Sequence, residues 1–164
     1  MVDGPDINQL EEKAKHYAPK LFFTQSLGHN PTGGSATLGV QYQILKLADK
    51  YDFFCVDDDA FADLFPGNLP RMAALDQLDR VIYIGTYSKT LSANLRVGYI
   101  AGKEKLIKSL SHIKMLTLVS SSDYLERWLH EVLANGQYLR HLRRLGPLVD
   151  TCLLYTSPSP RDAT

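Results

Sequence analysis

The sequence predicts an α/β fold, with three α/β/α layers built around a mostly parallel sheet that includes one antiparallel strand. Segments of helical spacing alternate with short apolar segments through the first hundred residues, which is typical of this class. The segment DFFCV (52–56) is apolar without alternation, as in a strand covered on both faces. The stretch between about Thr86 and Arg96 is too short for a helical crossover, so the strands it joins should be antiparallel.

Each element is expected from its own pattern. The clearest helix carries Ile44, Leu47, Ala48 and Tyr51 on one stripe, and a helix over 122–136 should end at Asn135-Gly136. Strands are predicted where apolar runs end at turn clusters. The predicted helices are 7–17, 40–51, 103–116, 122–136 and 137–146, and the predicted strands are 20–26, 52–56, 80–87 and 97–102.

Composition predicts a single soluble, cytoplasmic domain. The 164 residues are 45% hydrophobic and carry 18 basic and 18 acidic side chains, so there is no general attraction to nucleic acid or to an anionic membrane. No apolar run is long enough to span a membrane, and the polar N-terminus lacks a secretory signal. Cys55, Cys152 and the five histidines show no metal-ligand spacing, so no metal site is expected.

The domain is expected to occupy residues 1–150. Residues 152–164 (CLLYTSPSPRDAT) break the pattern and resemble translated sequencing adapter, so they are set aside as a non-native tail. The alternative is a natural disordered tail.

Three polar turns follow predicted strands, and they contain Asn30, Asp58 and Lys89. The carboxyl ends of parallel strands share one edge of a sheet, which is where open α/β sheets bind ligands. Lys89 is not a P-loop lysine, because Ser88 and Tyr83 occupy the positions where that motif needs glycine. A partly desolvated lysine at this edge can form a Schiff base. The alternative is an exposed loop lysine.

Three adjacent aspartates (57–59) directly after an apolar strand are unusual, since like charges repel one another. The one that faces the crevice needs a cationic partner, and a protonated pyridine nitrogen is such a partner. A Schiff-base lysine paired with an aspartate on a pyridinium nitrogen is the mark of pyridoxal-phosphate (PLP) sites.

These motifs together resemble the fold-type I PLP enzymes of the class I/II aminotransferase family. They are HNPTG (29–33), DDDAF (57–61), and TYSK followed by LRVGY (86–99). The nearest likeness is to the aminotransferase-like domains of MocR-type GntR regulators, and it covers about residues 4–150.

The resemblance implies a role for each matching residue. Lys89 matches the lysine that binds the cofactor covalently and moves a proton. Asp58 matches the carboxylate that keeps the pyridine nitrogen protonated, and Asn30 the donor to the 3′ oxygen. Arg96 and Thr86 match the side chains that bind the phosphate. Relatives also imply a cis bond before Pro31, and they usually carry tyrosine at Phe61, which cannot donate a hydrogen bond.

Some of these residues have structural alternatives. Asn30 can serve turn chemistry alone, and Asp59 is expected to cap the following helix. Arg96 could form an ion pair with Asp63. Tyr99 is expected in the core.

The resemblance implies a fragment of a PLP-dependent aminotransferase that acts on an amino acid and a 2-oxo acid, homodimeric at full length and inactive as this chain alone. The alternative is the PLP-binding effector domain of a MocR-type GntR regulator, which would contact DNA only through a helix-turn-helix segment upstream of Met1.

Overall fold

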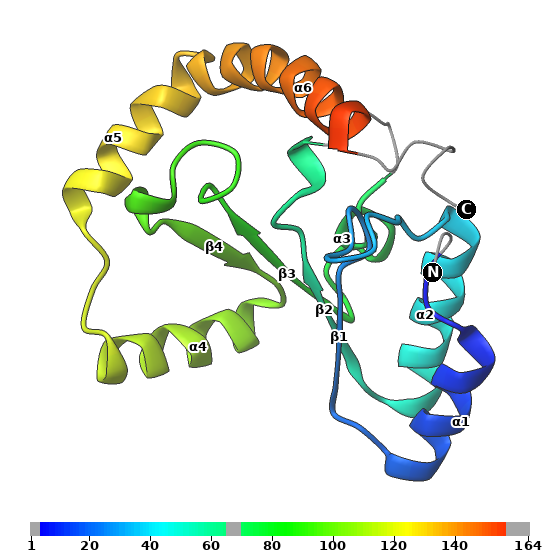
Figure 1. Ribbon diagram of the computed structural model, residues 1–164. Coiled ribbons are helices and arrows are strands. Elements are labelled where there is room, and N and C mark those ends of the chain that lie inside the picture. Colours follow the sequence, from blue (N-terminus) through cyan, green and yellow to red (C-terminus); the bar gives the residue numbers. More distant parts are fainter. Residues whose placement is uncertain (1–3, 65–69, 157–164) are drawn as a thin grey trace.

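A computed structural model describes residues 4–64 and 70–156. Its four strands are β1 (Leu21–Thr24), β2 (Phe54–Asp58), β3 (Val81–Thr86) and β4 (Gly98–Ala101). They form one sheet in the order β1-β2-β3-β4 (Figure 1). β1, β2 and β3 are parallel to one another, whereas β4 is antiparallel to β3. The predicted α/β class and its single antiparallel strand are therefore confirmed.

Six α-helices and two short 3-10 helices accompany the sheet in the described residues. They are α1 (Ile7–Tyr17), α2 (Leu38–Tyr51), η1 (Ala62–Leu64), α3 (Met72–Asp76), η2 (Ala93–Leu95), α4 (Glu104–Thr117), α5 (Asp123–Ala134) and α6 (Gln137–Thr156). The helices α1 and α2 lie on the β1 side of the molecule, and α4 and α5 follow β4 on its other side (Figure 1). The helix α6 arches back across the top of the sheet in the same view.

The core lies between the sheet and the first helices. Phe22 of β1, Cys55 of β2 and Val81 of β3 are neighbours in register and point to one face, where they meet Ile44 of α2. The buried cluster comprises Ala14, Ile44, Leu47, Ala48, Phe53, Cys55, Met72 and Val81. The apolar stripe read from the sequence of α2 is thus the surface that packs on the sheet.

Local signals explain where the helices begin. The carboxylate of Asp6 accepts hydrogen bonds from the backbone N–H groups of Asn8 and Gln9, and Thr37 caps α2 in the same way. The helix α3 was not predicted, because five residues carry too little periodicity. Its Met72 is fully buried and joins the core.

The end of one helix and the burial of one tyrosine differ from the sequence-based expectation. α6 runs to Thr156 and includes Pro147, so the helix continues into the segment that was set aside as a tail. Residues 157–164 lie outside the described part of the chain. Tyr99 was expected in the core but is 45% exposed, because its ring stands over Gly85 near the rings of Tyr83 and Tyr87 rather than under a helix.

Candidate functional site

The candidate site forms where β1, β2 and β3 end. These strands are parallel, so their carboxyl ends share one edge of the sheet, as predicted. Asp58 is the last residue of β2 and is in register with Ile84 of β3. Thr86 lies two residues beyond Ile84 and therefore on the same face of the sheet. Strand geometry places the Cα atoms of Asp58 and Thr86 about 8 Å apart.

Asp58 and the Asn30 turn are joined by a residue that sequence reasoning missed, Gln25. The Gln25 Nε2 group donates to Asp58 Oδ2 over 3.1 Å, and the backbone N–H of Asn30 donates to Gln25 Oε1 over 2.8 Å. A backbone N–H can only donate, so the amide of Gln25 must turn its oxygen to Asn30 and its NH₂ to the carboxylate. The sequence could have indicated Gln25 by its position directly after β1, because the other site residues also follow strands at this carboxyl edge of the sheet. The Asn30–Pro31 peptide bond is cis, as expected.

Lys89 lies in the turn after β3. Its Nζ is 5.6 Å from the centroid of the Phe61 ring, within the range of a cation–π contact. The turn is closed by two hydrogen bonds, from the backbone N–H groups of Leu91 and Ser92 to the carbonyl oxygen of Tyr87. Lys89 itself is exposed, so the expected partial desolvation is absent from this chain. Phe61 follows Asp58 by three residues, so the ring brings the amine toward the β2 end of the site.

Thr86 and Arg96 line a cavity of about 520 Å³ between β4 and α4, which also receives Lys114. Asp58 and Lys89 are not among the residues that line it. Arg96 is exposed and has a left-handed backbone conformation, with φ 52°. The alternative ion pair between Arg96 and Asp63 does not form, because Asp63 is bound to Arg71. Arg96 takes part in no ion pair within residues 4–64 and 70–156.

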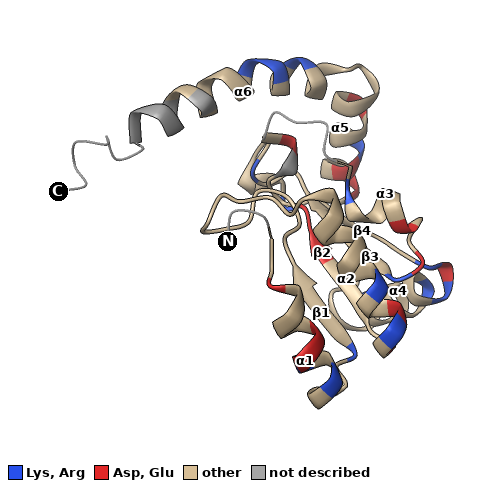
Figure 2. Ribbon diagram, turned by 90° about the vertical axis from the view of Figure 1, so that its right-hand side faces the viewer, with Lys and Arg blue, Asp and Glu red and all other residues tan. Residues whose placement is uncertain are grey.

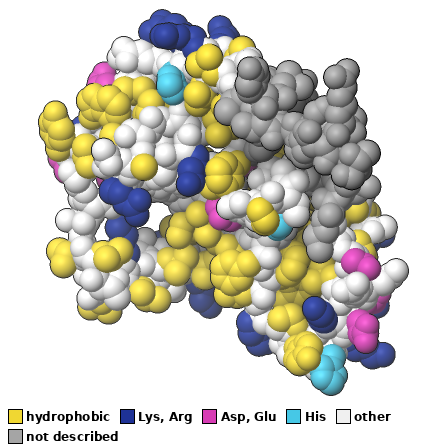
Figure 3. Space-filling view, in the orientation of Figure 1, with side chains coloured by type: hydrophobic (Ala, Val, Ile, Leu, Met, Phe, Trp, Pro, Cys, Tyr) yellow, Lys and Arg dark blue, Asp and Glu magenta, His cyan; other side chains and the backbone are white. Residues whose placement is uncertain are grey.

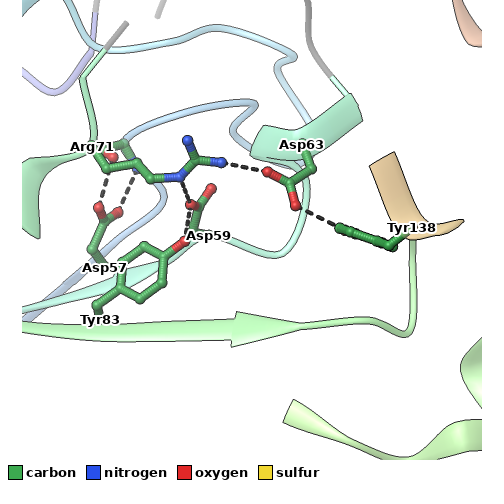
Figure 4. Close-up of polar contacts among 7 residues, drawn as sticks. Asp57, Asp59, Asp63, Arg71, Tyr83 and Tyr138 are labelled. Carbon is green, nitrogen blue, oxygen red and sulfur yellow. Dashed lines mark hydrogen bonds and ion pairs between the residues drawn. The ribbon is translucent and has the colours of Figure 1, made fainter. Parts of the chain in front are cut away.

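The neighbouring aspartates have structural roles that differ from that of Asp58 (Figure 4). Asp57 is buried and accepts hydrogen bonds from the backbone N–H and the hydroxyl of Ser26. Burial raises the pKa of Asp57, and the hydrogen bonds from Ser26 oppose this shift. Asp59 was expected to cap the following helix, but its carboxylate binds other groups instead. Its Oδ2 accepts from Arg71 Nε over 2.6 Å and from the hydroxyl of Tyr83.

The ion pair between Asp59 and Arg71 also changes the groups around it. Burial opposes the charged form of Arg71, but the hydrogen bond and the charge of Asp59 outweigh it and raise the pKa of Arg71. The pKa of Tyr83 is raised by burial and by the same carboxylate. Asp59 is thus paired with Arg71 and Asp57 is buried against Ser26, which leaves Asp58 at the end of β2, held by Gln25 and without an ion pair among the residues that the structure describes.

The donor set at this edge fits a phosphorylated pyridine aldehyde better than a metal ion. Asp58 and Lys89 supply a carboxylate and an amine, and Arg96 and Thr86 supply a guanidinium and a hydroxyl in the cavity between β4 and α4, which are the kinds of group that such a cofactor requires. In the described part of the chain, no group of three His, Cys, Asp or Glu side chains could hold a metal ion. Among the same residues, no helix combines the length and the hydropathy that a bilayer crossing requires.

The sequence profile of the family "Aminotransferase class I and II" matches residues 3–144. The chain belongs to this family. A curated relative, the "Uncharacterized HTH-type transcriptional regulator YisV" of Bacillus subtilis, is 33% identical over 142 residues, which is 85% of this chain and 29% of the relative. The "HTH-type transcriptional regulator NorG" of Staphylococcus aureus (strain N315) is 29% identical over 85% of this chain and 32% of its own length. This aminotransferase-family chain thus spans about a third of these curated relatives.

Solved structures give the same family. The multiple substrate aminotransferase of Thermococcus profundus superposes with a TM-score of 0.87 and 25% identity, over 92% of this chain and 39% of that one. The kynurenine aminotransferase of Pyrococcus horikoshii, solved with PMP, has a TM-score of 0.85 and 28% identity over 90% of this chain and 38% of its own. The α/β fold of class I and II aminotransferases is therefore the fold of this chain.

Proposed function

We propose that this chain holds pyridoxal 5′-phosphate as part of an aminotransferase that moves an amino group between an amino acid and a 2-oxo acid. The family assignment supports the proposal, and so does the PMP bound to a structural neighbour. The observation that carries it is the position of Asp58, a carboxylate without a cationic partner that Gln25 orients at the ends of the parallel strands. We propose that the complete protein is a homodimer.

Each side chain has a distinct proposed role toward the cofactor. PLP, when bound, supplies an electron-accepting pyridine ring. Asp58 holds a proton at the ring nitrogen, and Asn30 donates to the 3′ oxygen. Lys89 would hold the cofactor through its amine, with loss of water from the aldehyde, and would move a proton on the substrate. Arg96 and Thr86 bind the phosphate through a fixed charge and a hydroxyl.

Phe61 distinguishes this site from one with tyrosine at the same position. A phenylalanine ring has no hydroxyl, so it gives the 3′ oxygen no second hydrogen bond. Its aromatic face instead contacts the Lys89 amine. We propose that Phe61 guides Lys89 by this contact.

The proposal is tested by trapping. The 164-residue chain is incubated with pyridoxal 5′-phosphate, reduced with borohydride, digested and mapped by mass spectrometry. We expect the pyridoxyl label on Lys89 and its loss in Lys89→Met. The control is Lys105→Met, because Lys105 is an exposed lysine on α4. Label spread evenly over exposed lysines would contradict the proposed role of Lys89.

A second candidate is the PLP-binding effector domain of a transcription regulator. It is favoured by the curated relatives, which are named as HTH-type regulators. The two candidates are separated in the protein of the parent gene. Conversion of a 2-oxo acid to an amino acid, in a half-reaction panel, supports the aminotransferase. A basic helix-turn-helix segment upstream of Met1, with DNA binding that responds to an amino acid, supports the regulator.

A further inference from the structure

A continuous set of polar contacts joins the neighbour of Asp58 to the neighbour of Lys89. It begins at Asp59, whose Oδ2 accepts from Arg71 Nε over 2.6 Å. The other side of the guanidinium donates to Asp63 Oδ1 over 2.5 Å. The second oxygen of Asp63 lies 2.8 Å from the hydroxyl of Tyr138 (Figure 4). That hydroxyl lies 2.9 Å from Thr90 Oγ1. We call Asp59, Arg71, Asp63, Tyr138 and Thr90 the polar relay.

The direction of the hydrogen bonds in the polar relay follows from its chemistry. A carboxylate can only accept, so the single proton of the Tyr138 hydroxyl goes to Asp63. The hydroxyl of Thr90 must then donate to the oxygen of Tyr138. Burial raises the pKa of Tyr138, and the Asp63 carboxylate adds to this shift, so the phenol keeps its proton. The hydrogen bonds of the polar relay therefore have a single set of donors and acceptors, with Thr90 donating to Tyr138 and Tyr138 donating to Asp63.

Both ends of the Thr90 contact are buried. The side chain of Tyr138 belongs to α6, and the residue is 7% exposed, while Thr90 is 2% exposed. A second residue of α6, His141, places its Nε2 3.0 Å from the carbonyl oxygen of Thr90. The ring of Tyr138 also packs edge-on against Tyr87, with centroids 5.5 Å apart. The helix therefore holds the Lys89 turn on both sides of the lysine.

We propose that the polar relay sets the position of Lys89 relative to Asp58, with Tyr138 as the positioning residue that links the two. This inference rests on the proposed function, since those two side chains are its amine and its acid. Asp59 directly follows Asp58, and Thr90 directly follows Lys89. The relay thus runs from Asp59 to Thr90, and Tyr138 of α6 is its only member within an α-helix among the described residues.

The polar relay also gives the turn that carries the exposed Lys89 amine a buried point of attachment. The Lys89 turn is held locally by short-range hydrogen bonds, including two to the carbonyl of Tyr87 and one from the Ser88 N–H to Thr86 Oγ1. Short turns of this kind open easily when few buried groups hold them. The buried hydroxyl of Thr90 is the side-chain anchor next to the lysine, and its partner is supplied by a helix far along the chain. Removal of that partner frees the turn while the sheet remains intact.

The test uses Tyr138→Phe, which removes the hydroxyl and keeps the ring that packs on Tyr87. The matched control is Tyr124→Phe, the same change at a tyrosine on α5 that is 76% exposed. The first readout is hydrogen exchange of the backbone amides of Leu91 and Ser92, compared with those of β2. We expect exchange in the turn to quicken by about tenfold in Tyr138→Phe, in line with the loss of a hydrogen bond to a charged group, and β2 to be unchanged.

The second readout is the borohydride trapping at Lys89, resolved into a half-saturating concentration of pyridoxal 5′-phosphate and a rate at saturation. Arg96 and Thr86 are outside the polar relay, so we expect the half-saturating concentration to stay within about twofold and the rate to fall by about tenfold. Asp63→Asn, at a half-exposed residue, repeats the test without a change in the buried cluster. Tyr138 still contacts Thr90 in this variant, so we expect a smaller effect in the same direction, and the double variant to match Tyr138→Phe.

The possible failures can be told apart. Unchanged exchange at Leu91 and Ser92 in both variants would overturn the polar relay, whether or not the cofactor binds. Faster exchange with an unchanged trapping rate would show that the relay is structural only and would overturn the positioning role. No trapping at Lys89 in the unmodified chain would instead refute the proposed function, and with it the role of the relay toward the cofactor.

Discussion

Replacement of Arg71 by methionine tests the electrostatic description of the three aspartates most directly. The side chain of Asp59 is 2% exposed, and its Oδ2 lies 2.6 Å from Arg71 Nε, whose side chain is 39% exposed. Methionine keeps most of the aliphatic stem of the arginine and removes its charge. The buried carboxylate is then left with the hydroxyl of Tyr83 as its only partner in the described residues.

The expected loss follows from charge separation and burial. Opposite charges about 4 Å apart attract by about 4 kcal/mol at an effective dielectric constant of about 20. Loss of one partner from a buried pair costs about 3–5 kcal/mol. Water reaches the exposed part of Arg71 and lowers this value, so we expect Arg71→Met to reduce the free energy of unfolding by about 3 kcal/mol.

The assay is urea unfolding followed by circular dichroism. The control is Arg127→Met, since Arg127 and Asp123 form an i,i+4 pair with side chains 80% and 77% exposed, worth only about 0.5 kcal/mol. The double variant Asp59→Asn/Arg71→Met should recover part of the loss, because no buried charge remains at that position. Equal unfolding free energies for Arg71→Met and Arg127→Met would refute the reasoning.

Three further changes probe other parts of the site. Asp57→Asn should stabilise the chain at neutral pH, because burial raises the pKa of the folded Asp57 carboxyl above 3.8. The stability that the protonated carboxyl contributes is present below that pH and is lost as the pH rises through the folded pKa. Urea unfolding from about pH 3 to about pH 8 should therefore show a smaller fall in the free energy of unfolding for the variant. Gly85→Ala should destabilise the sheet, because the added Cβ would lie within 2.6 Å of the Tyr99 hydroxyl oxygen; Gly85→Ala in a Tyr99→Ala background should unfold at nearly the same urea concentration as Tyr99→Ala alone. Gln25→Leu should raise the half-saturating concentration of pyridoxal 5′-phosphate by about fivefold, because Asp58 loses the donor that orients it; an unchanged value would contradict that role.

The amino-acid sequence was sufficient for the order and type of the longer elements. The apolar stripe of α2 and the short apolar runs of β2 and β3 are local patterns, and each predicts its element without knowledge of the rest. The length of the β3–β4 connection predicted the antiparallel strand, since it is a limit on chain geometry. The motifs identified the family on the same local basis.

Errors arose where the partner of a residue lies far away in the chain. Asp59 was assigned to a helix cap because capping is local, whereas its partner Arg71 is twelve residues on and Tyr83 is on the next strand. Tyr99 looked like a core residue by type, but its ring covers Gly85 at the surface. Neither outcome follows from spacing or composition.

The sequence by itself thus determined the alternation of helices and strands, the shared edge of the parallel strands, and the family, because each depends on periodicity, loop length or motif. Only the tertiary structure decided which aspartate pairs with Arg71, that Gln25 orients Asp58, and that Tyr138 of α6 reaches the turn of Lys89. Those contacts join residues 12 to 48 positions apart, from Arg71 with Asp59 to Tyr138 with Thr90. Contacts of that kind depend on how the packed elements orient their side chains, and no local pattern encodes them.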